Sequence, residues 1–473
     1  MELTFLGGND TVTGSSTLLR ISDKKIIVDM GIMQSNGGIE GFKKAHQFNS
    51  RDFEYDPKEI DAVFLTHAHI DHIGRVPLII DKKPEIDIIC TEPTANLGAL
   101  NIKDSAYLNQ KECDRMNKRL GCNNFKPIYT EEEVSSIENK FKCYDYHQKI
   151  FIKQNHEEEI YGELIPAGHM IGSASIKITH KTSFYEKSYF FTGDTSGQSN
   201  RIPYTKPCPK IKEVDYIITE STYGNRKHKK IDFKETLYLY IKNTIKRKGM
   251  VLIPVFALHK STTILQMIYE IFEENSELSH LPVYLDSPMA IESHKMIKNS
   301  EKYWDKKWAD KLEDNNVWNW NNLKLLKNFK QTAALDVNKP GILVSCSGML
   351  SGGRAIYNLQ KMLPNPKNSI IFTGYAPKGT LAHTLIFDSK KYINIQGEYI
   401  KSRSQIIRIP FSGHADQNEL TEWIKTSDPK KLKKVFLMHG DKNSTEEFCK
   451  HLKKELNKVE IVKTRYMKSI KTY

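Results

Sequence analysis

The run Thr66-His67-Ala68-His69-Ile70-Asp71-His72 constrains this chain more than any other segment. It places three imidazoles and one carboxylate within six residues, directly after the apolar run Ala62–Leu65, which is typical of a buried strand. Neutral imidazoles and carboxylates are the nitrogen and oxygen ligands that Zn²⁺ takes in proteins. An extended strand end can direct His67 and His69 at one ion, while the last two residues of the run turn toward a second. The run therefore predicts two metal ions and a hydrolytic reaction.

The main alternative for this run is a histidine-rich surface loop. Such loops rarely follow a buried strand so closely, and they rarely hold an aspartate in register with the histidines. The position of the run directly after Ala62–Leu65 therefore favours a metal site.

The length and composition bound the class of protein. A chain of 473 residues predicts two or three domains with ample core. The net charge of +13, from 70 Lys and Arg against 57 Asp and Glu, attracts polyanions, although a lysine-rich surface also serves solubility. Seven scattered cysteines without a C-x-x-C pair argue against a cysteine zinc site and for a reducing cytoplasm. With no leader-like N-terminus and no apolar stretch near ~20 residues, we expect a cytoplasmic protein without a membrane span.

Helix and strand patterns alternate along the chain, which indicates an α/β fold. Helical spacing covers 94–120 and 131–140 in the first half. The middle of the chain predicts further helices and short strands, which are a helix at 232–247, a strand at 251–254, a helix at 260–274, a strand at 283–285 and a largely helical segment at 290–330. The tryptophans of that last segment are expected in the core rather than as base-stacking platforms.

Two late strands end in histidine-bearing turns, Phe411–Asp416 and Leu437–Asp441, which are like the turns of the first half. The simplest arrangement is one metal-binding domain that is interrupted by an inserted domain. We expect the first part of the core at 1–224, the insert at 225–403 and the second part of the core at 404–473.

Further candidate ligands follow other strands. His169 lies in a turn of glycines and small residues that allows close backbone approach, and Asp194 follows a buried strand, where its two oxygens can each bind one metal. Each ion needs about four protein ligands or fewer and an open position for water, and a hydroxide shared by both would be the nucleophile. One site is expected to use His67, His69, His169 and Asp194, and the other Asp71, His72, Asp194 and His439.

Two residues are left without a metal role in this scheme. His414 and Glu220 each follow or end a predicted strand. A histidine that is held by a carboxylate is suited to protonating a leaving oxygen. Asp29 has the same placement at a strand end as Asp194, and we expect it behind the ligands rather than on a metal.

These residues resemble the motifs of the metallo-β-lactamase superfamily and specifically its β-CASP group of RNA-processing nucleases. His-x-His-x-Asp-His is the second motif of the superfamily, and Asp29, His169 and Asp194 match the first, third and fourth. Three later segments are similar to β-CASP motifs A, B and C, namely Thr219–Gly224, Ser412–Asp416 and Met438–Gly440. The resemblance spans essentially the whole chain, in the right order. It is nearest to compact bacterial and archaeal members and to the endonuclease subunit of the cleavage and polyadenylation specificity factor.

The resemblance implies a four-layer αβ/βα core with an inserted α/β cap, the β-CASP domain, which closes over two Zn²⁺ ions. It also implies a zinc-dependent ribonuclease in which His414, Glu220 and Asp71 take part in catalysis. The histidine at motif C, His439, marks the RNA-processing branch. Cleavage is expected to be endonucleolytic, with 5′ exonucleolytic cleavage left open. A homodimer and a processing-complex partner both remain open.

Two glycine-rich turns in the insert could present backbone N–H groups to phosphate. The first contributes Ser347, Gly348, Gly352, Gly353 and Arg354, and the second, within Gly374–Thr380, contributes Lys378, Gly379 and Thr380. Ordinary glycine-rich connections are the alternative for both turns.

The sequence also departs from the β-CASP pattern. The family usually has Gly-Arg where this chain has His259-Lys260, and it has Gly-Arg again where this chain has Ala382-His383. Two planar, bidentate phosphate binders are thus replaced by a weaker binder, Lys260, and a titratable one, His383.

Two other functions compete with a ribonuclease. A small-molecule metallo-hydrolase of the same superfamily generally lacks a large cap and a motif B histidine, so the segment 231–403 argues against it. An RNA-binding subunit with little activity would be expected to lose metal ligands, whereas here every ligand position is filled.

Overall fold

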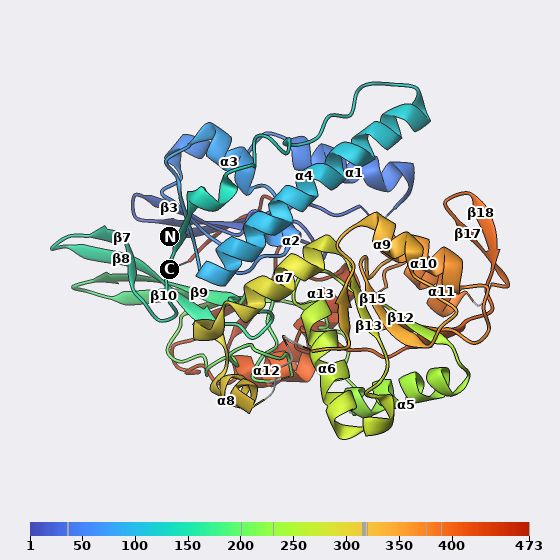
Figure 1. Ribbon diagram of the computed structural model, residues 1–473. Coiled ribbons are helices and arrows are strands. Elements are labelled where there is room, and N and C mark those ends of the chain that lie inside the picture. Colours follow the sequence, from blue (N-terminus) through green and yellow to red (C-terminus); the bar gives the residue numbers. More distant parts are fainter. Residues whose placement is uncertain are drawn as a thin grey trace.

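The computed structural model describes residues 1–472 except 36, 200, 230, 315–317, 319, 375 and 389. Two seven-stranded sheets form the centre of the larger part (Figure 1). The first sheet runs in the order β22 (Ser469–Lys471), β1 (Glu2–Gly7), β2 (Ser16–Ile21), β3 (Lys24–Val28), β4 (Ala62–Phe64), β5 (Asp87–Cys90) and β6 (Phe141–Cys143). The second runs in the order β21 (Glu460–Lys463), β20 (Lys434–Met438), β11 (Tyr216–Glu220), β10 (Glu186–Phe191), β9 (Ala174–Thr182), β8 (Glu158–Pro166) and β7 (Ile150–Gln154).

Three apolar clusters hold this core together in four layers. The inner faces of the two sheets pack on each other, with Phe5 and Phe64 from the first sheet and Tyr189 and Phe436 from the second. The outer face of the first sheet packs on helices α2 (Ile70–Ile73), α3 (Val76–Lys82) and α4 (Glu92–Leu120), while α1 (Gly38–Ser50) lies nearby. The outer face of the second sheet packs on α12 (Gln417–Ile424) and α13 (Lys442–Glu455), around the buried Trp423. The predicted αβ/βα core is therefore confirmed.

The sheet edge that bears the candidate ligands is set by parallel pairing. Strand β3 pairs in parallel with β4, and β10 and β20 pair in parallel with β11. Carboxyl ends of parallel neighbours meet at one edge of a sheet. The residues that follow or end these strands are Asp29, His67, Asp194, Glu220 and His439.

The second part of the molecule is a three-layer α/β cap. Its all-parallel sheet runs in the order β14 (Leu323–Leu325), β13 (Val283–Asp286), β15 (Gly341–Ser345), β12 (Met250–Pro254), β16 (Ser369–Phe372) and β19 (Gln405–Arg408). One face packs on α5 (Phe233–Lys246), α6 (Lys260–Glu274) and α7 (Pro288–Lys298), and the other on α10 (Arg354–Met362) and α11 (Leu381–Phe387). The cap also contains α8 (Lys306–Asp314), α9 (Phe329–Ala334) and the hairpin of β17 (Tyr392–Ile395) and β18 (Glu398–Lys401). The predicted inserted α/β domain is therefore present.

Strand β19 bears on the boundary between cap and core. Its backbone pairs with β16 over Gln405–Arg408, so this strand extends the cap sheet. The expected division at residue 403 would separate β19 from its sheet. We therefore propose that the cap runs from about residue 225 to about residue 409, and that the second part of the core begins after it.

Two helical expectations differ from the structure. Only Ile137–Lys140 of the segment 131–140 is helical, as one 3₁₀ turn. Ser135 and Ser136 disfavour a continuous helix there, because serine hydroxyls compete for backbone hydrogen bonds and favour turns. The segment 290–330 contains strand β14, which pairs in parallel with β13 at the edge of the cap sheet. Its alternating Leu323-Lys324-Leu325 is a short strand pattern that a search for helical spacing overlooks.

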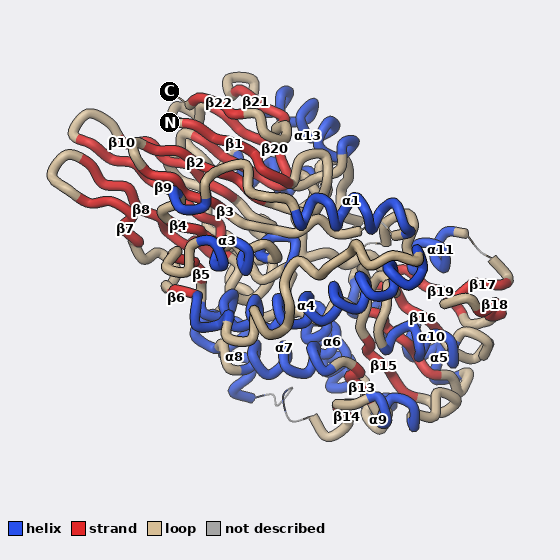
Figure 2. Tube along the Cα trace, turned by 90° about the horizontal axis from the view of Figure 1, so that it is seen from above, coloured by secondary structure: helices blue, strands red, loops and turns tan. Residues whose placement is uncertain are grey.

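Three of the four cap tryptophans lie at the border with the core, and the fourth, Trp320, packs on α6 within the cap. Trp304, Trp308 and Trp318 surround the buried ring of Tyr204, with ring centroids 5.3–5.4 Å from it. Their packing in this cluster joins the cap to the loop after β10. Among the described residues, no helix is both long and apolar enough to span a membrane. The two termini lie side by side, since β22 pairs with β1 (Figure 2).

Candidate metal centre

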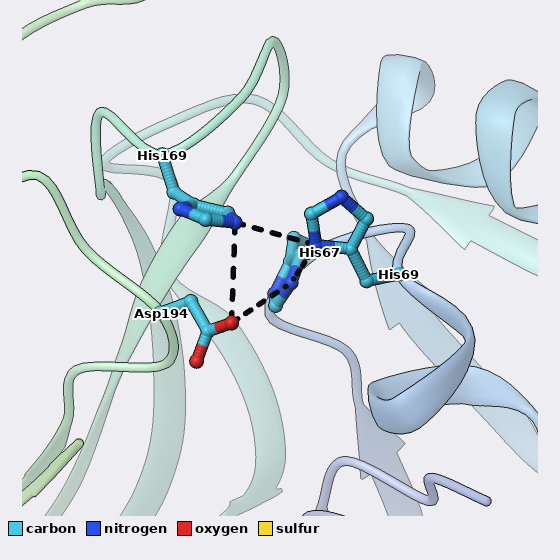
Figure 3. A group of neighbouring side chains, drawn as sticks. All are labelled: His67, His69, His169 and Asp194. Carbon is cyan, nitrogen blue, oxygen red and sulfur yellow. Dashed lines mark hydrogen bonds and ion pairs between the residues drawn. The ribbon is translucent and has the colours of Figure 1, made fainter. Parts of the chain in front are cut away.

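Four side chains from three loops converge on one point (Figure 3). Nδ1 of His69 lies 3.0 Å from Nε2 of His67 and 3.3 Å from Nε2 of His169. Oδ2 of Asp194 lies 3.6 Å from Nε2 of His67 and 3.9 Å from Nε2 of His169. With metal–nitrogen bonds of about 2.0 Å, the ligand atoms of a tetrahedral site lie about 3.3 Å apart. The spacing of these four atoms therefore fits one Zn²⁺-sized ion.

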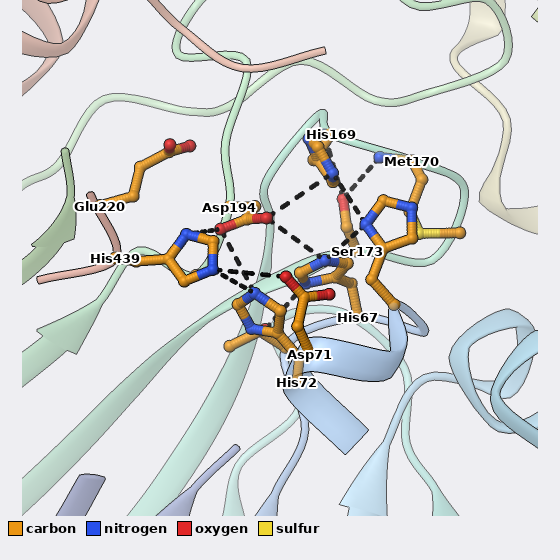
Figure 4. A network of polar contacts seen from close by, with 12 residues as sticks. His67, Asp71, His72, His169, Met170, Ser173, Asp194, Glu220 and His439 are labelled. Carbon is orange, nitrogen blue, oxygen red and sulfur yellow. Dashed lines mark hydrogen bonds and ion pairs between the residues drawn. The ribbon is translucent and has the colours of Figure 1, made fainter. Parts of the chain in front are cut away.

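A second group lies on the other side of Asp194 (Figure 4). Nε2 of His439 lies 3.2 Å from Nε2 of His72 and 3.6 Å from Oδ2 of Asp71. Oδ1 of Asp194 lies 3.4 Å from Nε2 of His72 and 3.0 Å from Nδ1 of His439. The structure thus brings all seven predicted ligands together, with one oxygen of Asp194 toward each group.

Hydrogen bonds fix which nitrogen each ring turns toward the centre. Nδ1 of His169 faces the carbonyl of Gly413 at 3.3 Å, and Nδ1 of His72 faces Oδ2 of Asp29 at 2.7 Å. These acceptors hold the proton on Nδ1 and leave a lone pair on each Nε2. The centre therefore brings the ring nitrogens of these histidines within reach of a shared ion.

The electrostatics of the site also suit a cation. Burial and neighbouring imidazoles lower the pKa of His67 and His169 well below the usual value, so these rings are neutral. Burial opposes a charge on His439 too, but the carboxylates of Asp194 and Asp71 raise its pKa to about 10. Oδ1 of Asp194 is buried and lies 3.0 Å from Nδ1 of His439. Asp194 and Asp29 likewise raise the pKa of His72 well above its usual value, against the effect of burial. The neutral rings offer lone pairs, and a bound cation would replace the protons that the carboxylates hold on His72 and His439, so the donor set fits a metal.

Asp29 is linked to ligand histidines through hydrogen bonds. Besides His72, its carboxylate accepts hydrogen bonds from the backbone N–H and the hydroxyl of Thr66, at 2.8 and 2.9 Å. The Thr66 hydroxyl, having donated to Asp29, can accept from Nδ1 of His67 at 3.0 Å. Thr66 thus connects Asp29 to two ligand histidines. Its part could not be read from the sequence, where it is one threonine among many at a strand end.

His414 and Glu220 form a pair beside the two groups. Nδ1 of His414 lies 2.9 and 3.1 Å from the two oxygens of Glu220, and its Nε2 lies 3.9 Å from Oδ2 of Asp194. Glu220 is also held by the backbone N–H of Thr195 at 2.7 Å. Burial works against a charge on the ring, but Glu220 and Asp194 together raise the pKa of His414. The His414 side chain is 20% exposed, so it can meet a substrate.

Close backbone contact behind the run 66–72 requires a glycine at position 31. A methyl group on Gly31 would lie 1.6 Å from the carbonyl oxygen of Asp71 and 2.8 Å from the backbone nitrogen of His72. We expect Gly31→Ala to lower the free energy of unfolding by about 1–3 kcal/mol, because the segment with two ligands must move. Metal affinity should fall as well. Thermal unfolding and metal titration measure both, with Gly352→Ala as the control because nothing lies within 4 Å of its added methyl.

Of the residues predicted to bind phosphate in the two glycine-rich turns of the cap, Arg354 is already engaged within the protein. Nη1 of Arg354 lies 3.0 Å from Oδ1 of the buried Asp286 and donates to the carbonyl of Leu326 at 2.7 Å. Asn358 and Thr332 donate to the same carboxylate. The Arg354 guanidinium therefore holds the cap together, which corrects its expected place among phosphate binders. Asp286, which has no role in the sequence argument, is the centre of this network.

The other residues of these loops remain candidates. Lys378 and Gly379 are exposed, and Ser347 and Gly348 are partly exposed. Gly352, Gly353 and Thr380 belong to the same two turns, of which Tyr375 lies outside the described residues. Gly379 approaches the core, since a methyl group on Gly37 would lie 3.3 Å from its carbonyl oxygen.

His259 and Lys260 join the cap to the loops of the centre. Nδ1 of His259 accepts from the backbone N–H of Ile171 at 2.8 Å, and its Nε2 donates to the carbonyl of Pro203 at 3.0 Å. Lys260 donates to the carbonyl of Phe411 at 2.8 Å, and burial lowers its pKa to about 7. His259 has φ +55°, a conformation that favours glycine, which explains the usual glycine there.

Three family models match consecutive parts of the chain. The Metallo-beta-lactamase superfamily matches 9–223, the Beta-Casp domain 262–385, and the Zn-dependent metallo-hydrolase RNA specificity domain 399–463. These segments contain the seven ligands, most of the cap and the pair of His414 with Glu220. The chain belongs to the β-CASP group of the metallo-β-lactamase superfamily. The predicted family is confirmed, and this β-CASP protein is a metal-dependent hydrolase.

Curated relatives match along nearly the whole β-CASP chain. Ribonuclease TTHA0252 of Thermus thermophilus is 28% identical over 93% of both chains, and an RNase J-like protein of Methanocaldococcus jannaschii is 29% identical over 96% of both. Cleavage and polyadenylation specificity factor 73 of Drosophila melanogaster is 24% identical over 94% of this chain and 60% of its own. A solved structure of a protein of unknown function from Enterococcus faecalis covers 99% of both chains with a TM-score of 0.54 at 12% identity, which shows the fold alone.

Proposed function

We propose that this β-CASP protein is a ribonuclease that uses two Zn²⁺ ions to hydrolyse phosphodiester bonds in RNA. The observation that carries the proposal is the placement of Asp194. Its two oxygens face two separate groups of ligands, and the His414–Glu220 pair lies 3.9 Å from one of these oxygens. Two-metal centres of this kind are suited to in-line displacement at phosphorus.

His67, His69, His169 and Asp194 would hold one ion, and Asp71, His72, Asp194 and His439 the other. When bound, the ions supply a nucleophile at neutral pH and offset negative charge on the phosphoryl oxygens. Glu220 orients His414 through Nδ1, which leaves Nε2 facing the substrate side. His414 then donates a proton from Nε2 to the leaving 3′ oxygen, so that the products carry a 3′ hydroxyl and a 5′ phosphate.

Several observations support RNA as the substrate. The protein carries a net charge of +13, which attracts a polyanion. Relatives that match over nearly the whole chain are named ribonucleases, and the C-terminal match is an RNA specificity domain. The cap contacts the core loops of the centre through His259 and Lys260, and the loops at 347–353 and 378–380, which contain exposed residues, are candidate contacts to the RNA backbone.

We also propose a cytoplasmic location, which the free cysteines support. Assembly as a homodimer or in a processing complex stays a prediction. The similar Drosophila protein is named a cleavage and polyadenylation specificity factor, and purification of the tagged protein from its own cells tests for a partner.

Incubation with a circular RNA distinguishes endonucleolytic from 5′ exonucleolytic cleavage. We expect the zinc-loaded protein to cut the circle and to release internal fragments from a 5′-labelled linear RNA, because endonuclease activity needs no free end. Gel analysis of both substrates measures this. An intact circle together with release of labelled mononucleotides would instead establish 5′ exonuclease activity.

The ribonuclease proposal itself has a separate control. A small molecule of the kind that other members of the superfamily hydrolyse, such as a thioester or a lactone, is incubated with the same preparation. Hydrolysis of that substrate with both RNAs intact would favour the alternative function.

A further inference from the structure

Three neighbouring strands of the cap sheet, β12, β15 and β16, end at an edge that faces the core. The loop after β12 continues to His259, which contacts Ile171 of the core. The loop after β16 contains Gly379, whose carbonyl lies next to Gly37 of the core. In open parallel α/β sheets, ligands bind outside the carboxyl ends of the strands. The ends of these three strands are therefore the part of the cap best placed for a substrate.

Phe256 is a large apolar side chain that is left exposed at this edge. It lies two residues after the end of β12, and 40% of its surface is exposed. Gly348 and Gly374, in the loops after β15 and β16, lie along one edge of its ring. A methyl group on Gly348 would lie 3.4 Å from Cδ2 of Phe256, and one on Gly374 would lie 3.7 Å from Cε2. Because neither neighbour has a side chain, neither covers the ring.

The surroundings of Phe256 suit a nucleic acid better than a purely apolar partner. Lys378 is exposed in the loop after β16. Aromatic rings beside cations are the usual means by which proteins hold single-stranded nucleic acid, because each base has a face that can stack. The cap tryptophans Trp304, Trp308 and Trp318, by contrast, are packed around Tyr204.

We propose that Phe256 is a stacking site for one nucleobase of the RNA, within a few nucleotides of the scissile phosphate. This inference rests on the proposed ribonuclease function. A base that stacks on Phe256 fixes how far the strand extends from the cap, and so determines which phosphate reaches the metal centre. The contact is tolerant of base identity, since stacking uses the face of the base and not its edge.

A series of RNA substrates tests the proposal. Each substrate carries one abasic nucleotide, at successive positions around the cleavage site, and is cut by the zinc-loaded wild type, Phe256→Ala and Phe256→Trp. We expect one abasic position to raise the KM of the wild type about tenfold. Phe256→Ala should show a similar rise with intact RNA and no further rise at that position, while Phe256→Trp should restore the wild-type pattern.

The matched control is Phe184→Ala, which removes another exposed phenylalanine. Phe184 is 93% exposed, at the tip of the β9–β10 hairpin, far from the cap (Figure 2). The control should behave as the wild type does. A Phe256→Ala protein that keeps the wild-type KM, or that stays sensitive to the same abasic position, would overturn the inference. If the wild type cleaves no RNA, the proposed function fails, and the same series read as binding affinity decides the role of Phe256 alone.

Discussion

Replacing Asp194 by Asn is expected to remove both metal binding and RNA cleavage. One oxygen of this carboxylate lies 3.6 Å from Nε2 of His67 and the other 3.0 Å from Nδ1 of His439. An amide offers one oxygen and no charge, so at most one group keeps its ligand. Because bound metal supplies several kcal/mol of transition-state stabilisation, the rate should fall on the order of a thousandfold or more. Metal content by mass spectrometry and cleavage rates at saturating RNA measure the two losses.

Asp215→Asn provides the matched control for that experiment. Asp215 is also buried and directly precedes β11, where it accepts from the backbone N–H of Ser188 and lies 3.2 Å from Nζ of Lys433. It is remote from the ligands along the same sheet, so this variant should keep its metal and its activity. Retention of two metal ions and of the wild-type rate by Asp194→Asn would contradict the bridging role.

His414→Ala is expected to lower kcat by about 10²–10⁴ while the metal content stays unchanged. The ring lies beside both groups but is held by Glu220, so its removal takes away a proton donor and leaves the seven ligands in place. An RNA with sulfur in place of the scissile 3′ oxygen sharpens the test. A thiol has a lower pKa than an alcohol, so the sulfur leaves as a thiolate without being protonated. The variant should therefore cleave this substrate almost as fast as the wild type does.

Glu220→Gln gives the pH signature of the same pair. The carboxylate favours the protonated ring, so the amide should lower the pKa of His414. Activity that needs the protonated ring falls as the pH rises through that pKa, and the falling limb of the profile should move to lower pH in the variant.

The His414→Ala experiment with the two RNAs can contradict this role. Equal slowing of His414→Ala on the oxygen and sulfur substrates would exclude His414 as the proton donor.

Much of this centre could be predicted from the sequence because its ligands follow buried strands. Apolar runs such as Ala62–Leu65 define the strands, and parallel pairing brings the residues after them to one edge. The fold itself does not require a histidine or a carboxylate directly after a buried strand, so such residues at several strand ends indicate a site. Asp194 or Glu220 alone would not indicate a site, but their shared position at strand ends on the same sheet edge does.

Other parts of the site depend on contacts that a linear sequence does not contain. Arg354 follows a glycine-rich loop, as a phosphate binder would. Its guanidinium instead forms an ion pair with Asp286, which lies 68 positions away in the sequence. His259 looks like a loss of the usual glycine, and its two bonds to the core follow only from the packing of the cap. Strand β19 belongs to the cap because of its pairing with β16 and not because of its composition.

The central claim is that two metal ions held by these residues hydrolyse RNA. The most direct measurement follows cleavage of an internally labelled RNA by one preparation, first stripped with a chelator and then titrated with Zn²⁺. The account predicts no cleavage by the stripped protein and full activity when about two ions per chain are bound. Cleavage that persists in excess chelator, or a fully loaded protein that leaves the RNA intact, would contradict it.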